Sequence, residues 1–406
     1  MDAGFQVPHA DAVDRAVPRV SLVTLIRGLS AAVMLSCGLA APALAQGDGV
    51  ITIGTVNSLT GPFAVIGRPL VAGANAYLKS VNDQGGVNGK QLRLVALDDQ
   101  INPDIGVAQA RKLIAQGVSI MLAPISSGVS GALLPVLAES KTPMIAYTGV
   151  EALEAEPNYF AVGLTTTQTL FVAANYIKSV AKGTPRIAFL TYESPASNTA
   201  RDAVAKQVQK WGWQVVEMQT YRGGAPDYTT QALKTVAAQP DYIIASMIDG
   251  QAPQIFSSLQ RAGSKATIVN FHAGAAENVF AAIASPLFLA MRDVPDPREA
   301  DPGLKAVRDA AQKYGLTGDM TSAVFTKGWI SAELAVDALK SCGNACTSEK
   351  ITAHLQGLTS FDTGVSAKLS YSATKHIGLS SARIYRWDPD KKVAAPISGY
   401  IDATPN

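Results

Sequence analysis

The chain has 406 residues, of which 48% are hydrophobic and 16% charged, and its formal net charge is +2 at pH 7. At about 150 residues per domain, this length predicts two or three domains with sizeable buried cores. The apolar content excludes intrinsic disorder, and the scattered glycines and prolines exclude a fibrous repeat. Nucleic-acid binding needs a clustered basic face, so the near-neutral charge predicts no nucleic-acid partner.

Residues 1–45 have the pattern of a secretory signal. Arginines precede an apolar stretch that ends in the small-residue site Ala43-Leu44-Ala45. We therefore expect residues 1–45 to be a cleaved signal peptide and the mature protein to be periplasmic. A membrane anchor is one alternative, but it needs about 20 apolar residues, and Gly38 and Pro42 weaken a helix here. A lipoprotein with Cys37 as its lipidated residue is the other alternative.

Cys342 and Cys346 are the cysteines that remain after removal of such a signal. Their C-x₃-C spacing, without neighbouring thiols or suitably spaced histidines, is unsuited to zinc. In an oxidising compartment the pair predicts a structural disulfide that closes a small loop and stabilises the fold by about 2 kcal/mol.

Short β-branched runs alternate with helical periodicity in the first half of the mature chain. The predicted strands are Val50–Val56, Leu92–Leu97, Ser119–Ala123 and Met144–Ala146. Helices are predicted over Leu70–Val81, after the capping pair Asn102-Pro103, and around Val129–Leu137. The segment Gly85–Gly89 supplies glycines and an asparagine for a turn with positive φ. This alternation predicts a parallel sheet between layers of helices.

The same alternation restarts in the second half. Strands are predicted over Arg186–Leu190, Val215–Met218, Tyr242–Ser246 and Thr267–Asn270, with helices near Gln168–Lys182, Ala200–Trp211, Thr230–Ala238 and Gln254–Ala262. After Pro295 we expect helices near Gly303–Tyr314, Thr321–Leu339 and Ser348–Leu355, then strands at Ala367–Tyr371 and Ala382–Trp387. The sequence therefore predicts two α/β lobes of similar architecture.

The loops at the carboxyl ends of the first-lobe strands are rich in small polar residues. Ligands of open parallel sheets bind outside these strand ends. Ser126, Ser127 and Gly128 open a helix, where free backbone N–H groups and hydroxyls form an anion site. The alternative is that Ser126 or Ser127 only caps this helix.

Templates for catalysis and cofactor binding are poorly matched. The sequence has no Gly-x-Ser-x-Gly elbow, and Gly85–Lys90 lacks the Ser/Thr of a phosphate loop because Gln91 stands there. Its four histidines form no metal pair at helical spacing, and no dinucleotide fingerprint follows the first strand. His272 is either a catalytic base or, as we prefer, a pocket or cap residue. We expect no metal, no cofactor and no enzymatic activity.

Segments distributed over the whole mature chain carry a family resemblance. They are ITIGTVNSLTGPFAVIG (Ile51–Gly67), SVNDQGGVNGKQLRLVALDDQINP (Ser80–Pro103) and APISSGVSGALLPVLAESKTPMIAY (Ala123–Tyr147), with weaker matches at Pro226–Ile243 and Phe361–Gly378. In these segments the sequence resembles the periplasmic substrate-binding proteins of branched-chain amino-acid-type ABC transporters.

The resemblance implies an α/β, two-lobe type I periplasmic-binding-protein fold with a three-stranded hinge. Each lobe is expected to be a parallel sheet flanked by helices. Residues 46–165 and 296–377 would form lobe 1, and residues 166–295 and 378–406 would form lobe 2. The implied function is a monomeric receptor that closes on a small molecule and delivers it to ABC permease subunits. A sensory binding protein of the same fold and a hydrolytic enzyme are the alternatives.

The resemblance also implies ligand-binding residues in the first lobe. Ser127, helped by the Gly128 amide and next to Ser126, matches the position that binds the ligand carboxylate. Contacts from the following strand end and from the covering loop are implied for Tyr147, Thr148, Gly149, Phe63 and Ile66.

The second lobe departs further from the family pattern. Candidate ligand-binding residues there are Ser197, Asn198, Met247, Asp249, Phe271 and His272. The segment Phe271–Gly274 lacks the acid that pairs with a ligand ammonium in amino-acid binders, although Asp249 is a possible substitute. A buried, unpaired ammonium costs several kcal/mol. We therefore expect a ligand that keeps a carboxylate or amide but lacks an α-ammonium, such as an aromatic or short organic acid.

Overall fold

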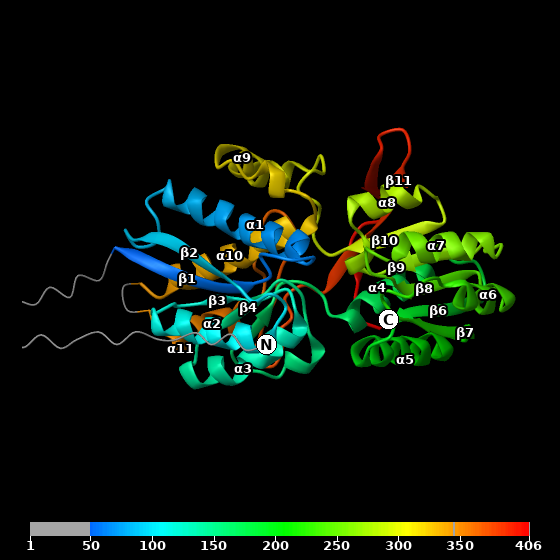
Figure 1. Ribbon diagram of the computed structural model, residues 1–406, viewed down its shortest axis with the longest axis horizontal. Coiled ribbons are helices and arrows are strands. Elements are labelled where there is room, and N and C mark those ends of the chain that lie inside the picture. The colour runs from blue at the N-terminus through cyan, green and yellow to red at the C-terminus, as the bar shows by residue number, and fades with distance from the viewer. Residues whose placement is uncertain (1–48, 344–345, 406) are drawn as a thin grey trace, which may run out of the picture. The chain divides into compact units, whose positions relative to one another are not determined.

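Two β-sheets organise the computed structural model, which describes residues 49–343 and 346–405 (Figure 1). The predicted signal segment lies outside the described residues. The five-stranded sheet has the order β2-β1-β3-β4-β5, and the larger one has the order β12-β11-β10-β9-β8-β6-β7, with β13 paired to β11. The predicted α/β class with helices flanking parallel strands is confirmed.

The first sheet is entirely parallel. Its strands are β1 (Val50–Asn57), β2 (Gln91–Asp98), β3 (Met121–Leu122), β4 (Met144–Ala146) and β5 (Tyr159–Ala161). Its helices are α1 (Ala64–Asn82), α2 (Pro103–Ala115), α3 (Ser127–Ser140), α9 (Lys305–Lys313), α10 (Ala323–Ser341) and α11 (Ser348–Gln356).

Alternation along these strands divides the helices between the two faces of the sheet. Leu122 and Ile145 belong to one core with apolar residues of α1 and α10. Their neighbours Met121 and Met144 belong to a separate core with residues of α2 and α3. Successive side chains of a strand point to opposite faces, so the sheet lies between the α1–α10 layer and the α2–α3 layer.

The second sheet combines parallel and antiparallel pairing. Its strands are β6 (Arg186–Tyr192), β7 (Gln214–Tyr221), β8 (Tyr242–Ser246), β9 (Thr267–Asn270), β10 (Phe288–Arg292), β11 (Ser381–Asp388), β12 (Val393–Pro396) and β13 (Ile401–Asp402). Its helices are α4 (Thr166–Val180), α5 (Pro195–Lys210), α6 (Thr229–Ala237), α7 (Ala252–Arg261) and α8 (Glu277–Ile283). Ile187 and Phe189 pack with α4 and α5, whereas Ala188 and Leu190 pack with α6 to α8.

Within the described residues, the chain passes between the sheets in three places. Residues 162–165 connect β5 to α4, and residues 293–296 lead from β10 toward α9, which packs on α1. The third passage precedes β11, where the Gly378 N–H donates to the Ala161 carbonyl at 2.8 Å before the chain enters the second sheet. Each sheet is therefore built from segments that are distant in the sequence.

Several elements differ from the sequence-based expectation. The strand predicted at Ala367–Tyr371 is wrong, because only an isolated bridge between Phe361 and Leu369 forms there. β10 was not predicted, since its residues Leu289, Ala290 and Met291 are not β-branched and fit a helix equally well. The strand predicted at Ala382–Trp387 is confirmed as β11, whereas β12 and β13, which pair with β11 in antiparallel orientation, were not predicted.

Local signals at turns and caps were read correctly. Asn102 accepts hydrogen bonds from the backbone N–H groups of Asp104 and Ile105, and α2 begins at Pro103. Gly86 has a φ of 77°, and a Cβ there would lie 2.0 Å from the Lys90 carbonyl oxygen. Cys342 and Cys346 are joined by a disulfide.

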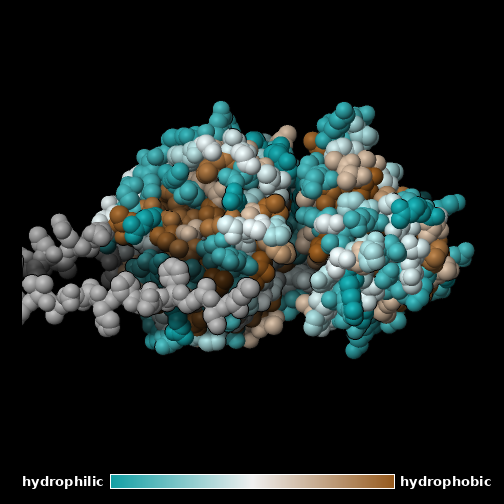
Figure 2. All heavy atoms as spheres, in the orientation of Figure 1, coloured by the Kyte–Doolittle hydropathy of each residue, from teal (hydrophilic) through white to brown (hydrophobic). Residues whose placement is uncertain are grey.

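The face shown in Figure 2 is mostly hydrophilic over the half that contains α5 to α7, with more apolar surface over the half that contains β1 and α10. Phe63 and Val65, at the start of α1, are among the large exposed apolar residues. No helix in the described part of the chain is long and apolar enough to cross a membrane.

Two glycines allow α1 and α10 to pack at backbone distance. A Cβ on Gly73 would lie 1.9 Å from the Phe325 carbonyl oxygen, and a Cβ on Gly328 would lie 2.0 Å from the Leu70 carbonyl oxygen. Neither position has room for a larger residue unless the helices separate. The close contact fixes the position of the α10 N-terminus.

We expect Gly328→Ala to destabilise the protein by about 1–3 kcal/mol, because overpacking displaces backbone. Chemical denaturation measures this loss. Gly131→Ala in α3 is the matched control, since its Cβ meets nothing within 4 Å. That control should leave stability unchanged or raise it by up to about 1 kcal/mol. Equal stability of Gly328→Ala and the parent chain would contradict the close contact.

Candidate functional site

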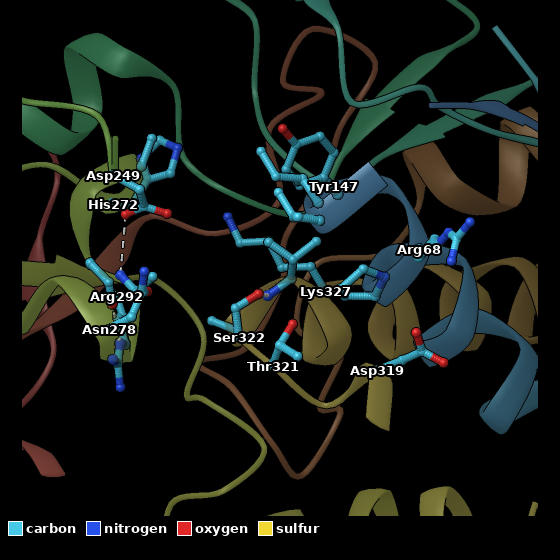
Figure 3. A pocket seen from close by; sticks show the side chains of 18 of the residues that line it. Arg68, Tyr147, Asp249, His272, Asn278, Arg292, Asp319, Thr321, Ser322 and Lys327 are labelled. Atoms are coloured by element: carbon cyan, nitrogen blue, oxygen red, sulfur yellow. Dashed lines mark hydrogen bonds between the residues drawn. The ribbon is translucent and has the colours of Figure 1, made fainter. Parts of the chain in front are cut away.

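A cavity of about 760 Å³ is lined by residues that belong to both sheets and their helices (Figure 3). The N-terminal ends of α1 and α10, together with Tyr147 after β4, form one side. Residues that follow β8, β9 and β10 form the other side. The titratable side chains of the lining, besides Tyr147, are Arg68, Asp249, His272, Arg292, Asp293, Arg298, Asp319 and Lys327. The cavity has the size and the mixed apolar and polar lining of a small-molecule site.

A buried ion pair stands at the junction of the cavity and the inter-sheet connections. Lys327 Nζ of α10 lies 2.8 Å from Asp293 Oδ2, and the two side chains are 4% and 2% exposed. Asp293 also accepts hydrogen bonds from the backbone N–H groups of Leu164 and Val294 at 3.1 Å each. Burial opposes ionisation, but the Lys327 ammonium and the Leu164 N–H hold the pKa of Asp293 below its usual value. Asp293 thus joins α10 to two of the connections between the sheets.

Two arginines of the lining are already neutralised by carboxylates. Arg292 is buried and forms ion pairs with Glu277 at 2.9 Å and Glu299 at 3.2 Å. Arg298 lies 2.7 Å from Asp296. Because removal of one partner would leave a buried charge uncompensated, these groups serve first to hold the cavity wall.

Asp249 brings a carboxylate to the second-sheet side of the cavity. It follows β8, and its Oδ1 accepts the Ala276 N–H at 3.3 Å. Burial raises the pKa of Asp249 to about 6, against the opposing effects of this hydrogen bond and of the Arg292 charge. Among the described residues, no cationic side chain forms an ion pair with it. A ligand group that donates hydrogen bonds would complete its environment.

His272 presents a neutral imidazole to the same cavity. It begins a short 3₁₀ turn, His272–Gly274, that follows β9. Burial, reinforced by the Lys327 ammonium, lowers the pKa of His272 to about 4. Its Nδ1 is buried and has no hydrogen-bond partner in the described part of the chain. The ring can therefore accept or donate a hydrogen bond toward a ligand without adding charge.

The structure brings four of the residues singled out in the sequence to this cavity. They are Ile66, Tyr147, Asp249 and His272. Ser127 and Thr148 line a second, much smaller cavity with Ser130 and Tyr159, and Tyr147 lines both cavities. Thr148 Oγ1 donates to the Leu164 carbonyl at 3.1 Å.

The remaining predicted first-lobe residues lie outside the large cavity. Ser126 caps α3, because its hydroxyl accepts the Val129 N–H at 3.3 Å. Gly128 is exposed, and Gly149 packs closely against Thr165. Phe63, at the start of α1, is 48% exposed. No contact of these residues with the large cavity is present.

The predicted second-lobe residues divide in the same way. Ser197 and Asn198 lie in the first turn of α5, where Ser194 Oγ accepts the Ser197 N–H and Asn198 accepts from Arg201. Met247 is fully buried, and Phe271 is 7% exposed within a hydrophobic core. Met247 and Phe271 therefore belong to the packed core next to Asp249 and His272 and do not line the large cavity.

The sequence reasoning missed the charged residues contributed by β10 and α10. Lys327 occupies a buried position of a largely apolar helix, and a lysine in such a stripe signals a buried partner. Arg292 and Asp293 end an apolar run that was not identified as a strand. Their pairing depends on contacts between distant segments. Within the described residues, no group of three or more His, Cys, Asp or Glu side chains could hold a metal ion.

Comparisons with known proteins agree with this architecture. A family model described as "Periplasmic binding protein" matches residues 50–392. The Leu/Ile/Val-binding protein BraC3 of Rhizobium johnstonii is 26% identical over 378 residues, which cover 89% of this chain and 97% of the relative.

Solved structures show the same fold at low sequence identity. A branched-chain amino acid ABC transporter structure from Thermus thermophilus with bound valine has a TM-score of 0.75 at 20% identity, covering 87% of this chain and 96% of that one. A solute-binding protein of an ABC transporter from Rhodopseudomonas palustris HaA2, in complex with p-hydroxybenzoic acid, has a TM-score of 0.75 at 19% identity, covering 88% and 98%.

We expect the His272 imidazole to remain neutral down to about pH 5. Its pKa of about 4 lies below the usual 6.5. The stabilising contribution of the neutral ring is therefore complete above pH 6.5 and is lost as the pH falls toward 4, because the unfolded chain binds the proton first. Proton NMR of the ring, assigned with His272→Gln, tests this. A titration midpoint near 6.5 would contradict the burial described.

Proposed function

The chain belongs to the periplasmic binding protein family, and we propose that it is the extracytoplasmic solute-binding receptor of an ABC importer. It would close on a small carboxylate- or amide-bearing ligand and deliver that ligand to the membrane permease. Residues 1–45 would direct export to the periplasm and then be removed.

The observation that supports this proposal is that the residues lining the cavity come from both sheets. Tyr147 and Lys327 come from elements of the first sheet, whereas Asp249 and His272 follow strands of the second sheet. A ligand between them gains its full set of contacts only when both sides grip it. This differential binding supplies the free energy for a hinge closure, which is how a receptor signals that it is loaded.

We further propose that the two sheets define two lobes. Residues 46–165 and 296–377 form lobe 1, and residues 166–295 and 378–406 form lobe 2. The inter-sheet connections at residues 162–165, 293–296 and 376–379 would act as the hinge. Because only a few chain segments connect the lobes, the lobes can rotate about these segments without unfolding either core.

Two ligand classes fit the cavity. Organic acids and amides without an ammonium group are one class, favoured because the segment Phe271–Gly274 has no acidic residue to pair with a ligand ammonium. Amino acids fit if Asp249 supplies that pairing, and its unpaired carboxylate in the lining is the specific observation that favours them. Structures of similar fold contain both classes, with valine bound in one and p-hydroxybenzoic acid in another.

A binding assay with chemical recovery of the ligand tests the receptor function. We expect an acid from a panel of L-valine, L-leucine, 4-hydroxybenzoate and octanoate to bind and to be recovered unchanged. At 100 times its Kd, such a ligand stabilises the protein by about 2.7 kcal/mol, which a thermal-shift screen detects.

The control for each acid is its methyl ester, which lacks the carboxylate. Conversion of a ligand to product would contradict a transport receptor and favour an enzyme. Binding of L-leucine or L-valine in the micromolar range, with no binding of the other acids, would contradict the organic-acid class and assign the ammonium to Asp249.

A further inference from the structure

Tyr147 separates the large cavity from the α3 N-terminus. Tyr147 is half-buried, and its hydroxyl donates to the Ile125 carbonyl at 3.2 Å. Tyr147 contributes to the walls of both the large cavity and the small cavity that contains Ser127. Ser127 is exposed and is not among the residues that line the large cavity, so a ligand there contacts Tyr147 rather than the Ser127 hydroxyl.

Lys327 offers a cation on the large-cavity side of that ring. Its Nζ lies 5.7 Å from the Tyr147 ring centroid. Of the three N–H bonds of this ammonium, one is directed to Asp293 Oδ2, and no other acceptor is found within the described residues. A buried ammonium with spare donors binds an anion strongly because water does not compete.

The other cations of the lining are less suited to this task. Among the described residues Lys327 has one protein acceptor, whereas Arg292 donates from all three of its nitrogens, to the Ala275 carbonyl, Glu277 and Glu299. Arg298 donates to both carboxylate oxygens of Asp296 and to the Thr321 carbonyl. Arg68 is exposed, and Figure 3 shows it beside Asp319, apart from the group formed by His272 and Asp249.

The start of α10 favours the same assignment. Thr321, Ser322, Ala323 and Val324 line the cavity, so the positive end of this 19-residue helix is directed to the region next to Lys327. The α10 N-terminus adds a favourable electrostatic contribution, and the buried Lys327 ammonium is the group that would contact the ligand anion.

We propose that Lys327, rather than Ser127, binds the anionic group of the ligand, with the α10 N-terminus and the His272 ring beside it. This inference rests on the proposed receptor function and deepens it. The chemistry recognised is a carboxylate. Because Asp293 holds the same ammonium and also accepts the Leu164 N–H, a ligand anion at Lys327 contacts the group that joins the inter-sheet connections.

The test compares acids with their matched amides by calorimetry, using L-valine and L-valinamide, 4-hydroxybenzoate and 4-hydroxybenzamide, and octanoate and octanamide. Lys327→Met should weaken binding of the preferred acid at least tenfold and change amide binding less than threefold. Lys327→Arg, which keeps the charge, should recover part of the acid affinity. Lys340→Met, on an exposed position of the same helix, is the matched control and should change neither.

Lys327→Met leaves the buried Asp293 carboxylate unpaired, which lowers the stability of this variant. The double variant Asp293→Asn/Lys327→Met removes both charges and should show the same loss of acid preference. A tenfold loss on Ser127→Ala, with acid affinity retained in either Lys327→Met variant, would overturn the inference and leave the receptor function standing. If none of the acids binds the parent chain, both the ligand class and the inference fail.

Discussion

The buried contact between Lys327 and Asp293 is the constraint on which the rest of this architecture depends. One carboxylate pairs with an ammonium from α10 and accepts a backbone N–H from another inter-sheet connection. An ion pair at 2.8 Å with almost no exposure is costly to form and costly to break. The ion pair therefore fixes the position of α10 relative to the inter-sheet connections. It also places a charged group in the wall of the cavity.

The packing around this pair explains why a cavity persists there. Gly73 and Gly328 bring α1 and α10 to backbone contact, so the N-terminal ends of both helices open on the same space. On the other side, the strands of the second sheet end in Asp249 and the His272 turn. Polar groups at element ends thus face one another across a space that neither core fills.

Most of the fold could be predicted from the sequence because its signals are local. β-branched runs, the Asn102 cap and the turn at Gly86 each depend on residues within a few positions. The site could be predicted only in part. Tyr147 and His272 follow strand ends and were found, whereas Lys327 and Asp293 are defined by a contact across 34 positions that leaves no short-range pattern.

A crystal structure of the protein with its tightest-binding acid would show whether the ligand lies between the two sheets. We expect the ligand to contact Tyr147 and Lys327 from one side and Asp249 or His272 from the other, with its carboxylate within hydrogen-bonding distance of Lys327 Nζ. A ligand bound to residues of one sheet alone, or outside this cavity, would contradict it.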